Sequence, residues 1–397
     1  MNDPSLSPST RFKDFFRMHL LANHYPALHG IRVLAVVTVV QVHLTILLRG
    51  GGLLDKRGEL SRYSMNISFG MDLFFILSGF LIGMILLHSF EQQKGRGILR
   101  FYARRAFRTF PPYYLVLILI SLVIPMSAKQ TDHLPYAFLY ISNYTGATRT
   151  ACVMPWNWSL CVEEHFYFAV PLLLLVLHLL RSHAARIGVL IFFWLGGTAT
   201  RLIIFYAHEG SWTPAALQHE LMYKSHARID ILVAGILLAY LHRYFQPQIA
   251  RLLTRLTARI ILWIVVLACL GILLNPSFFG GHIFLYRVLK WGTFTSVMYV
   301  PLILLLLNTE GWFQRFLSIS WFRRMATLGY GIYLVHFPVG AMLFPLAHLA
   351  IDAWFIPLEV VWPSFLALLL VCSVAVSYII HLLVEKPVLY LRDRISP

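Results

Sequence analysis

An arginine and a histidine, Arg32 and His43, lie eleven positions apart in the first long apolar segment of the chain. Eleven residues make about three turns of an α-helix, so both side chains lie on one face, about 16 Å apart along the axis. A charged side chain at the centre of a bilayer costs about 2.5–3.5 kcal/mol on insertion scales, so ionisable groups inside a span indicate a functional site by default. The alternative is that Arg32 extends to the headgroups and that His43 is a hydrogen-bonded packing residue.

Further ionisable residues interrupt the apolar segments that follow. These residues are Asp72, Glu163, Glu164, Arg201, Arg228 and Asp230. On the topology that the basic residues predict, they lie with His43 in the outer half of the membrane, where they could form one buried pocket. Acids and arginines in such a pocket can pair, which offsets the cost of insertion and shifts their pKa values. A structural ion-pair network is the alternative for Glu163, Glu164 and Arg201.

Histidine takes up and returns a proton near neutral pH, which suits His43 to general acid–base catalysis. A carboxylate on its second ring nitrogen would fix the tautomer and stabilise the imidazolium. We therefore predict a catalytic group of His43 and Glu164, with Glu163 beside them. Substrate contacts are predicted for Asp72, Trp158, Tyr167, Arg201, Arg228, Asp230 and His336. The two aromatic residues of this set are also typical interfacial anchors, and its histidine could equally be a packing residue.

The composition is typical of a membrane protein. Hydrophobic residues make up 58% of the 397 positions and charged residues 13%, and the mean hydropathy is +0.70. A soluble core could not bury this much apolar surface, so we predict an all-α, polytopic integral membrane protein. Ten spans are predicted, at about 31–49, 67–90, 111–127, 156–180, 187–207, 227–242, 258–274, 288–307, 326–350 and 359–383.

The distribution of lysine and arginine predicts the topology. About 21 of them fall in the N-terminal segment, the C-terminus and alternate loops, against about 8 in the other loops, so both termini are expected to face the cytoplasm. The formal net charge is +16, yet the basic residues form short clusters between apolar runs. We therefore expect no nucleic-acid partner.

The predicted domain organisation has one large part. Residues 1–24 form a cytoplasmic segment, residues 25–390 form the transmembrane domain, and residues 391–397 form a cytoplasmic tail. The first segment is predicted to contain an interfacial amphipathic helix that carries Phe12, Phe15, Phe16 and Leu20 among basic residues. The first thirty residues lack the apolar core and cleavage site of a secretory signal, so the N-terminus is expected to be retained. No second soluble domain is expected.

Three arginines, Arg104, Arg105 and Arg108, precede the third span on its inner side. Because Arg32 lies near the inner end of its own span, the face that it shares with His43 leads from the cytoplasm into the outer half of the bilayer. Acyl-CoA has the matching shape, with phosphates at one end and a thioester at the tip of a narrow arm. Arginine binds phosphate bidentately, so we predict that these four arginines bind acyl-CoA. Alternatively, the three-residue cluster serves only to set the topology and to contact anionic lipid.

The sequence offers less support for other chemistry. No metal-binding motif occurs and the four cysteines have no metal-ligand spacing, so no metal is predicted. A disulfide between Cys152 and Cys161 is left open. Ser78 and Gly79 are interpreted as a close helix contact, because the glycine-flanked elbow of a nucleophilic serine is missing.

Several motifs occur in order along nearly the whole chain. They are Arg32 with His43; Gly70-Met-Asp72-Leu-Phe-Phe-Ile-Leu-Ser78-Gly79-Phe80; Arg104-Arg105-Ala-Phe-Arg108 before Pro111-Pro112-Tyr113; Trp158-Ser159-Leu-Cys-Val-Glu163-Glu164-His165-Phe-Tyr167; Arg228-Ile-Asp230 with Gly235; Tyr333-Leu-Val-His336-Phe-Pro338; and Glu385-Lys386-Pro387. In these motifs the chain resembles the acyltransferase-3 family of membrane acyltransferases.

The resemblance implies a ten-helix core that moves acyl groups, usually acetyl, from cytoplasmic acyl-CoA to hydroxyls of carbohydrates in the bacterial envelope. It also implies that Arg32 and His43 are tied to activity and that the glutamate pair lies beside them. His165 stands where the family usually has glutamine. Some relatives carry an extracytoplasmic hydrolase-like domain that we expect this chain to lack, so it would acylate the acceptor directly or pass the acyl group to a separate protein.

We therefore expect a bacterial inner-membrane O-acetyltransferase that uses acetyl-CoA and acts on a glycan or a lipid-linked glycan, such as lipopolysaccharide, in contact with membrane lipid. One alternative is a transporter of lipid-linked sugars or small solutes whose intramembrane charges relay protons. Another keeps the enzyme and makes the acceptor a secreted small molecule such as a macrolide. A covalent acyl intermediate and a homo-oligomer are left open.

Overall fold

The structure is a computed structural model that describes residues 16–93, 97–145, 152–208, 213–280 and 283–395. Within these ranges the chain forms helices, turns and loops and no strand. Ten of the described helices are long and apolar enough to cross a membrane, and each coincides with one of the ten predicted spans. The predicted all-α, multi-span fold class is therefore confirmed, while the orientation of the termini stays a prediction.

The spans are built on ten of the described helices, and the eighth span, Leu285–Asn308, begins before its main helix and continues through a kink. The long helices are α2 (Pro26–Gly50), α4 (Gly70–Gln93), α5 (Gly97–Val123), α7 (Trp158–Leu179), α8 (His183–His208), α10 (Ile229–Leu253), α11 (Leu256–Leu274), α13 (Thr295–Asn308), α15 (Ser320–His348) and α16 (Leu358–Ile380). Shorter helices are α3 (Glu59–Asn66), α6 (Ala128–Phe138), α9 (Pro214–Tyr223), α12 (Ile283–Leu289), α14 (Trp312–Leu317) and α17 (Lys386–Ile395). Of the predicted amphipathic helix, Phe12 and Phe15 lie outside the described residues. Its later part, with Leu20, was predicted wrongly as helix, because residues 17–25 are irregular.

The chain divides into two compact units. The first unit takes in residues 1–65, 100–123 and 315–397, and the second takes in residues 66–99 and 124–314. The first unit thus holds α2, most of α5, and α15 to α17, whereas the second holds α4 and α6 to α13. Each unit is described by itself below.

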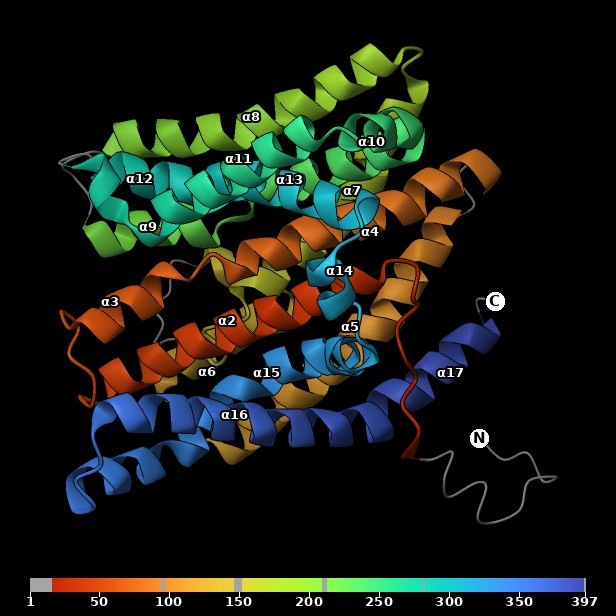
Figure 1. Ribbon diagram of the computed structural model, residues 1–397. Helices are drawn as coiled ribbons and strands as arrows, with labels where there is room; N and C mark the ends of the chain where they lie inside the picture. The colour runs from red at the N-terminus through yellow and green to blue at the C-terminus, as the bar shows by residue number, and fades with distance from the viewer. Residues whose placement is uncertain (1–15, 94–96, 146–151, 209–212, 281–282, 396–397) are drawn as a thin grey trace. The chain divides into compact units, whose positions relative to one another are not determined.

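In the first unit, α2 packs along α15 and α15 packs along α16, as Figure 1 shows for the red and blue helices. Near one end of this packing, Val33 of α2 forms an apolar cluster with Phe322 and Ala326 of α15. Farther along α2, the indole N–H of Trp362 on α16 donates to the hydroxyl of Thr45 over 3.4 Å. These contacts fix which faces of α2 and α15 meet, and so they position the histidines that both helices carry.

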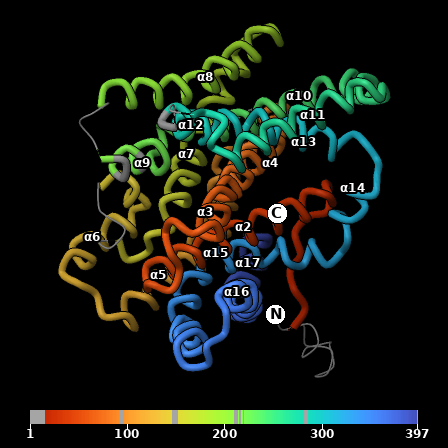
Figure 2. The backbone as a smooth tube through the Cα atoms, turned by 60° about the vertical axis from the view of Figure 1, so that its left-hand side comes forward, coloured from red at the N-terminus to blue at the C-terminus, as the bar shows by residue number. Residues whose placement is uncertain are grey.

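In the second unit, α10 is the central helix and packs against α4, α8 and α13 (Figure 2). The contact with α4 is made through two glycines, Gly79 and Gly235, at the closest approach of the two backbones. A Cβ added at Gly79 would overlap the carbonyl oxygen of Leu232, and one added at Gly235 would lie 2.8 Å from the Cα of Gly79. The interpretation of Gly79 as a close helix contact is confirmed, because small residues let helices approach in this way.

The helical run from α12 to α13 contains a kink at Lys290–Phe294. Trp291 (φ −80°, ψ 110°) and Gly292 (φ 87°, ψ −46°) leave the helical conformation there. A side chain at Gly292 would be strained by the positive φ and would also overlap the carboxylate of Asp230. The kink turns the backbone N–H of Gly292 toward Asp72, whose Oδ2 accepts it over 3.0 Å.

Candidate functional site

In the first unit, the structure brings together two of the predicted site residues, His43 of α2 and His336 of α15. The Nδ1 atom of His43 lies 2.7 Å from the Nε2 atom of His336, which is hydrogen-bond distance. The two ring planes lie 20° apart with their centroids separated by 4.9 Å. The other nitrogen of His336, Nδ1, lies 2.7 Å from the carbonyl oxygen of Tyr333. The result is a chain of hydrogen bonds from the α15 backbone to the half-buried ring of His43.

The ring of Phe337, the residue after His336, also contacts His43. The two centroids lie 5.9 Å apart with the rings at 80°, an edge-to-face geometry. Consecutive positions of α15 therefore hold the His43 ring through one polar and one aromatic contact. A side chain held in this way keeps one orientation, as a group that moves protons must.

Arg32 and His43 lie on one unbroken helix, since α2 runs from Pro26 to Gly50. The predicted common face and the axial separation of about 16 Å follow from this continuity. Arg32 is half-buried, as is the His43 ring. One helix of the first unit thus carries a guanidinium in its first two turns and an imidazole about three turns farther on.

The arginine cluster lies in the first half of α5, where Arg104, Arg105 and Arg108 are all half-buried. The Nη2 atom of Arg104 lies 3.4 Å from the Asp393 carboxylate, which also pairs with Arg392 over 2.8 Å. The imidazole of His19 lies 3.6 Å from the same carboxylate. The hydroxyl of Tyr330 on α15 donates to the carbonyl oxygen of Thr109 over 2.9 Å and so ties the cluster's helix to the rest of the first unit.

The pKa of His19 is lower than its ordinary value, and burial is the largest cause. The neighbouring positive charge of Arg392 adds to this effect, while the carboxylate of Asp393 opposes it. The ring is therefore mostly neutral at neutral pH, so the positive charge around Asp393 comes from the arginines.

In the second unit, Glu163 on α7 accepts hydrogen bonds at both carboxylate oxygens. The hydroxyl of Ser78 on α4 donates over 2.8 Å and that of Tyr167 donates over 3.0 Å. Both glutamates of the pair, Glu163 and Glu164, are half-buried, and they are adjacent in the second turn of α7. Glu163 is therefore held in place by hydroxyl groups from two helices, one of them on the predicted substrate residue Tyr167.

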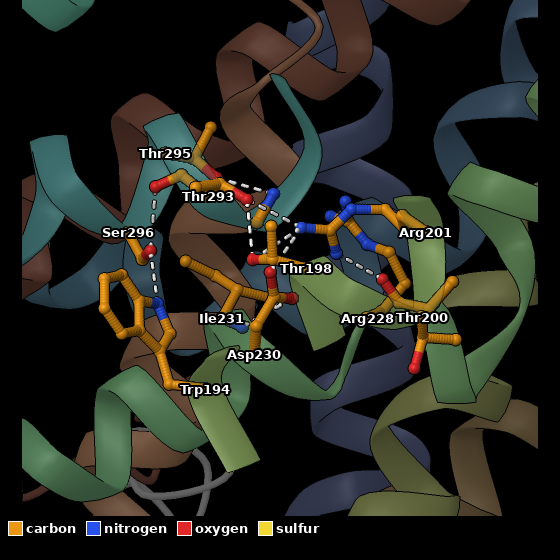
Figure 3. A network of polar contacts seen from close by, with 12 residues as sticks. Trp194, Thr198, Thr200, Arg201, Arg228, Asp230, Ile231, Thr293, Thr295 and Ser296 are labelled. Atoms are coloured by element: carbon orange, nitrogen blue, oxygen red, sulfur yellow. Dashed lines mark hydrogen bonds and ion pairs between the residues drawn. The ribbon is translucent and has the colours of Figure 1, made fainter. Parts of the chain in front are cut away.

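The second unit also contains two fully buried ion pairs, drawn in part in Figure 3. Arg201 pairs with Asp230 over 2.6 Å and donates from Nε to the carbonyl oxygen of Val288 over 2.8 Å. Arg228 makes a short ion pair with Asp72, whose second oxygen also accepts from the hydroxyl of Thr295. The charged partners come from α4, α8, the start of α10 and the residue before it, and they are joined by groups of α12 and of the first residue of α13.

The side chains of Arg201, Asp230, Arg228 and Asp72 are each 0% exposed. Such mutual pairing offsets the cost of burying charge. It also fits the ion-pair network that was the alternative interpretation of Arg201 in the sequence. The substrate contacts predicted for these four residues stay predictions.

The two aromatic residues of the predicted substrate set, Trp158 and Tyr167, are buried in the second unit, with exposed fractions of 7% and 5%. The indole of Trp158 lies 4.9 Å from the ring of Tyr223 between centroids. Near them, the ring of His165 lies 2.6 Å from the hydroxyl of Ser225. His165 therefore joins α7 to the segment that leads to Arg228.

Sequence reasoning missed the buried cation Lys290, at the kink of the second unit. Its side chain is buried, with Nζ 3.1 Å from the hydroxyl of Ser68 and 4.8 Å from the ring centroid of Trp291. The sequence does indicate this buried cation, because Lys290 stands near the start of an apolar run. Gly292, two residues later, marks the break in the helix at which this cation lies.

The described residues contain no group of three or more His, Cys, Asp or Glu side chains that could hold a metal. Cys152, Cys161, Cys269 and Cys372 are free thiols. The disulfide left open by the sequence is therefore not formed.

Comparison with known proteins identifies relatives for nearly the whole chain. The profile described as "Acyltransferase domain" matches residues 25–382. The chain is 25% identical over 344 residues to the peptidoglycan O-acetyltransferase OatA of Listeria monocytogenes, an alignment that covers 81% of this chain and 50% of the relative. It is 25% identical over 359 residues to the putative peptidoglycan O-acetyltransferase YrhL of Bacillus subtilis, covering 87% of this chain and 53% of the relative.

A putative O-acetyltransferase of Staphylococcus aureus is 23% identical over 346 residues, covering 82% of this chain and 52% of the relative. The chain thus spans about half the length of the curated relatives that it matches. No solved structure gives a significant match.

Proposed function

Because the chain belongs to the acyltransferase-domain family, whose profile covers residues 25–382, we propose that it is a membrane O-acyltransferase. It moves an acetyl or other short acyl group from cytoplasmic acyl-CoA to a hydroxyl of a carbohydrate on the outer side of the membrane. The observation that carries the proposal is the hydrogen-bonded pair His43–His336 inside this domain. The names of the relatives favour this activity over transport of a lipid-linked sugar or solute.

In the proposed mechanism His43 is the general base. It takes the proton of the acceptor hydroxyl as the oxygen attacks the thioester carbonyl, and the tetrahedral intermediate then collapses with cleavage of the carbon–sulfur bond. The imidazolium returns its proton to the departing thiolate, so the products are an acetyl ester and free CoA. Glu164 is the carboxylate proposed to stabilise the imidazolium, with Glu163 beside it, on sequence grounds alone.

The donor is proposed to lie along the face of α2. Its phosphates bind Arg32 and the cluster Arg104, Arg105 and Arg108, since guanidinium groups form bidentate hydrogen bonds with phosphate. The thioester then reaches His43, about 16 Å farther along the helix axis. Support comes from the unbroken course of α2 and from the half-buried arginines in the same unit.

The acceptor is proposed to be a glycan of the bacterial envelope, and the protein is proposed to lie in the inner membrane. Two relatives are named as peptidoglycan O-acetyltransferases, one of them as putative, which supports a carbohydrate acceptor. Trp158 and Tyr167 are the aromatic residues proposed, on sequence grounds alone, to lie beside the sugar. A lipid-linked glycan, as the form presented at the membrane surface, belongs to the same proposal.

The proposal is tested with the purified full chain in lipid nanodiscs and acetyl-CoA labelled in the acetyl group. We expect release of free CoA well above the rate of empty nanodiscs, and a further increase when a soluble glycan fragment is added. Acetyl-CoA should also raise the unfolding temperature, because a ligand that binds only the folded state stabilises it. A folded protein that neither consumes nor is stabilised by acetyl-CoA contradicts the proposal.

A further inference from the structure

Both nitrogens of His336 are engaged within the first unit. The ring is 0% exposed. Its Nδ1 atom lies 2.7 Å from the carbonyl oxygen of Tyr333 and 3.2 Å from that of Ile332, while its Nε2 atom lies 2.7 Å from Nδ1 of His43. This arrangement determines where the protons of both rings lie.

A carbonyl oxygen can only accept a hydrogen bond, so Nδ1 of His336 must carry a proton. A neutral imidazole has one N–H, which leaves Nε2 of His336 with a lone pair that accepts. The donor in the contact between the rings is then Nδ1–H of His43. The opposite arrangement would require a second proton on His336, that is, a positive charge on a fully buried ring, which a protein interior disfavours.

We propose that His336 is a positioning residue that keeps a proton on Nδ1 of His43 and thereby makes Nε2 of His43 the nitrogen that accepts the proton of the acceptor hydroxyl. The inference rests on the proposed function of His43 as general base. The sequence predicted that His336 contacts the substrate, whereas in this proposal His336 acts on the reaction through His43. Nδ1 of His43 donates to His336 in both the neutral ring and the imidazolium, so the contact persists through the proton transfer.

Two amide variants of His336 separate this role from packing. His336→Asn places its amide N–H near the position of the original Nδ1, where it can still donate to the Tyr333 carbonyl, but the side chain is too short to reach His43. His336→Gln reaches farther and can place an amide oxygen where Nε2 stood, so it can accept from His43. Both variants replace the same ring by an amide, which makes them a matched pair.

The direct readout is the ¹⁵N signal of the His43 ring in protein labelled at histidine, in lipid nanodiscs at a pH where the ring is neutral. The chain has 17 histidines, and comparison with His43→Ala identifies the signal of this one. We expect the Nδ1–H tautomer in the parent protein and in His336→Gln, and a substantial Nε2–H population in His336→Asn.

The second readout is the rate of acetyl transfer by the same preparations. We expect kcat of His336→Asn to fall by between about 10-fold and 10⁴-fold, the upper figure being the effect of a wrong tautomer in a serine protease, while KM for acetyl-CoA stays near the parent value. His336→Gln should recover most of the loss. Equal rates in the two variants would show that His336 acts through packing and would overturn the inference.

The ¹⁵N signals are read without turnover, so the inference and the proposed function can fail separately. A His43 ring protonated on Nε2 in the parent protein overturns the inference even if the enzyme is active. If His43→Ala retains full acetyl transfer, the general-base assignment fails, and the role of His336 as its positioning residue fails with it. The tautomer of His43 is still determined by the ¹⁵N signals in that case.

Discussion

Replacement of His43 by alanine is expected to lower the rate of acetyl transfer by about 10²–10⁴-fold, the contribution typical of a general base. The imidazole is the group proposed to remove the proton from the acceptor hydroxyl, and alanine cannot do this. The side chain is half-buried, and α2 keeps its apolar contacts to α15 without it. The fold should therefore persist. Initial rates of CoA release and acetyl-ester formation, measured together with the unfolding temperature, check this prediction.

The matched control is His178→Ala, which removes an exposed histidine from α7 of the second unit. Its rate should equal that of the parent protein. The account is contradicted if His43→Ala transfers acetyl at the parent rate. If His43→Ala loses its rate because it no longer folds, His43 is one of the residues that hold α2 to α15. His43→Gln, which retains a hydrogen-bonding side chain, then tests the chemistry. We expect it to recover folding without recovering the rate.

Replacement of Asp72 by alanine is expected to have the largest effect on stability, about 3–5 kcal/mol in the free energy of unfolding. The change leaves the guanidinium of Arg228 unpaired in a fully buried position. It also removes one of the two acceptors of the Gly292 N–H and the acceptor of the Thr295 hydroxyl at the kink. Thermal unfolding of the purified variant in detergent, followed by circular dichroism, measures the loss.

The double variant Asp72→Leu/Arg228→Met tests the cause. It removes both charges, and it should be more stable than Asp72→Ala because no unpaired charge stays buried. Glu59→Ala is the surface control, since Glu59 pairs with Arg62 while its side chain is 81% exposed, and such pairs contribute little. A double variant less stable than the single one would show that Arg228 stabilises the unit even without Asp72, and would contradict the unpaired charge as the cause.

The membrane spans could be predicted from the sequence because length and hydropathy decide them. Each of the ten predicted segments coincides with a long helix, and most differences lie at the ends, where short helices and turns continue the apolar run. The break at Lys290–Phe294 could not be predicted in this way. Gly292 adopts a positive φ where Asp72 and Asp230 lie against it, and these contacts come from distant parts of the chain.

The residue types of the candidate site could be predicted from the sequence, but the pairs that these residues form could not. The sequence predicted that buried acids and arginines pair, yet Asp72 and Arg228 are separated by 156 positions and hydropathy does not determine which helices meet. The same holds for His43, whose partner His336 lies 293 positions away. Reasoning from depth alone gave the second ring nitrogen of His43 to Glu164, whereas in the structure His336 lies at Nδ1 of His43.

The central claim is that the acyl group enters from cytoplasmic acyl-CoA and leaves on a glycan at the other face of the membrane. It is tested most directly with sealed membrane vesicles of both orientations and acetyl-labelled acetyl-CoA, which does not cross lipid. Vesicles with the cytoplasmic face outward should form labelled acetyl ester on the enclosed glycan, and those carrying His43→Ala should not. Right-side-out vesicles should form the ester only after acetyl-CoA is loaded inside. Equal labelling from both faces, or movement of glycan without consumption of acetyl-CoA, would contradict the account.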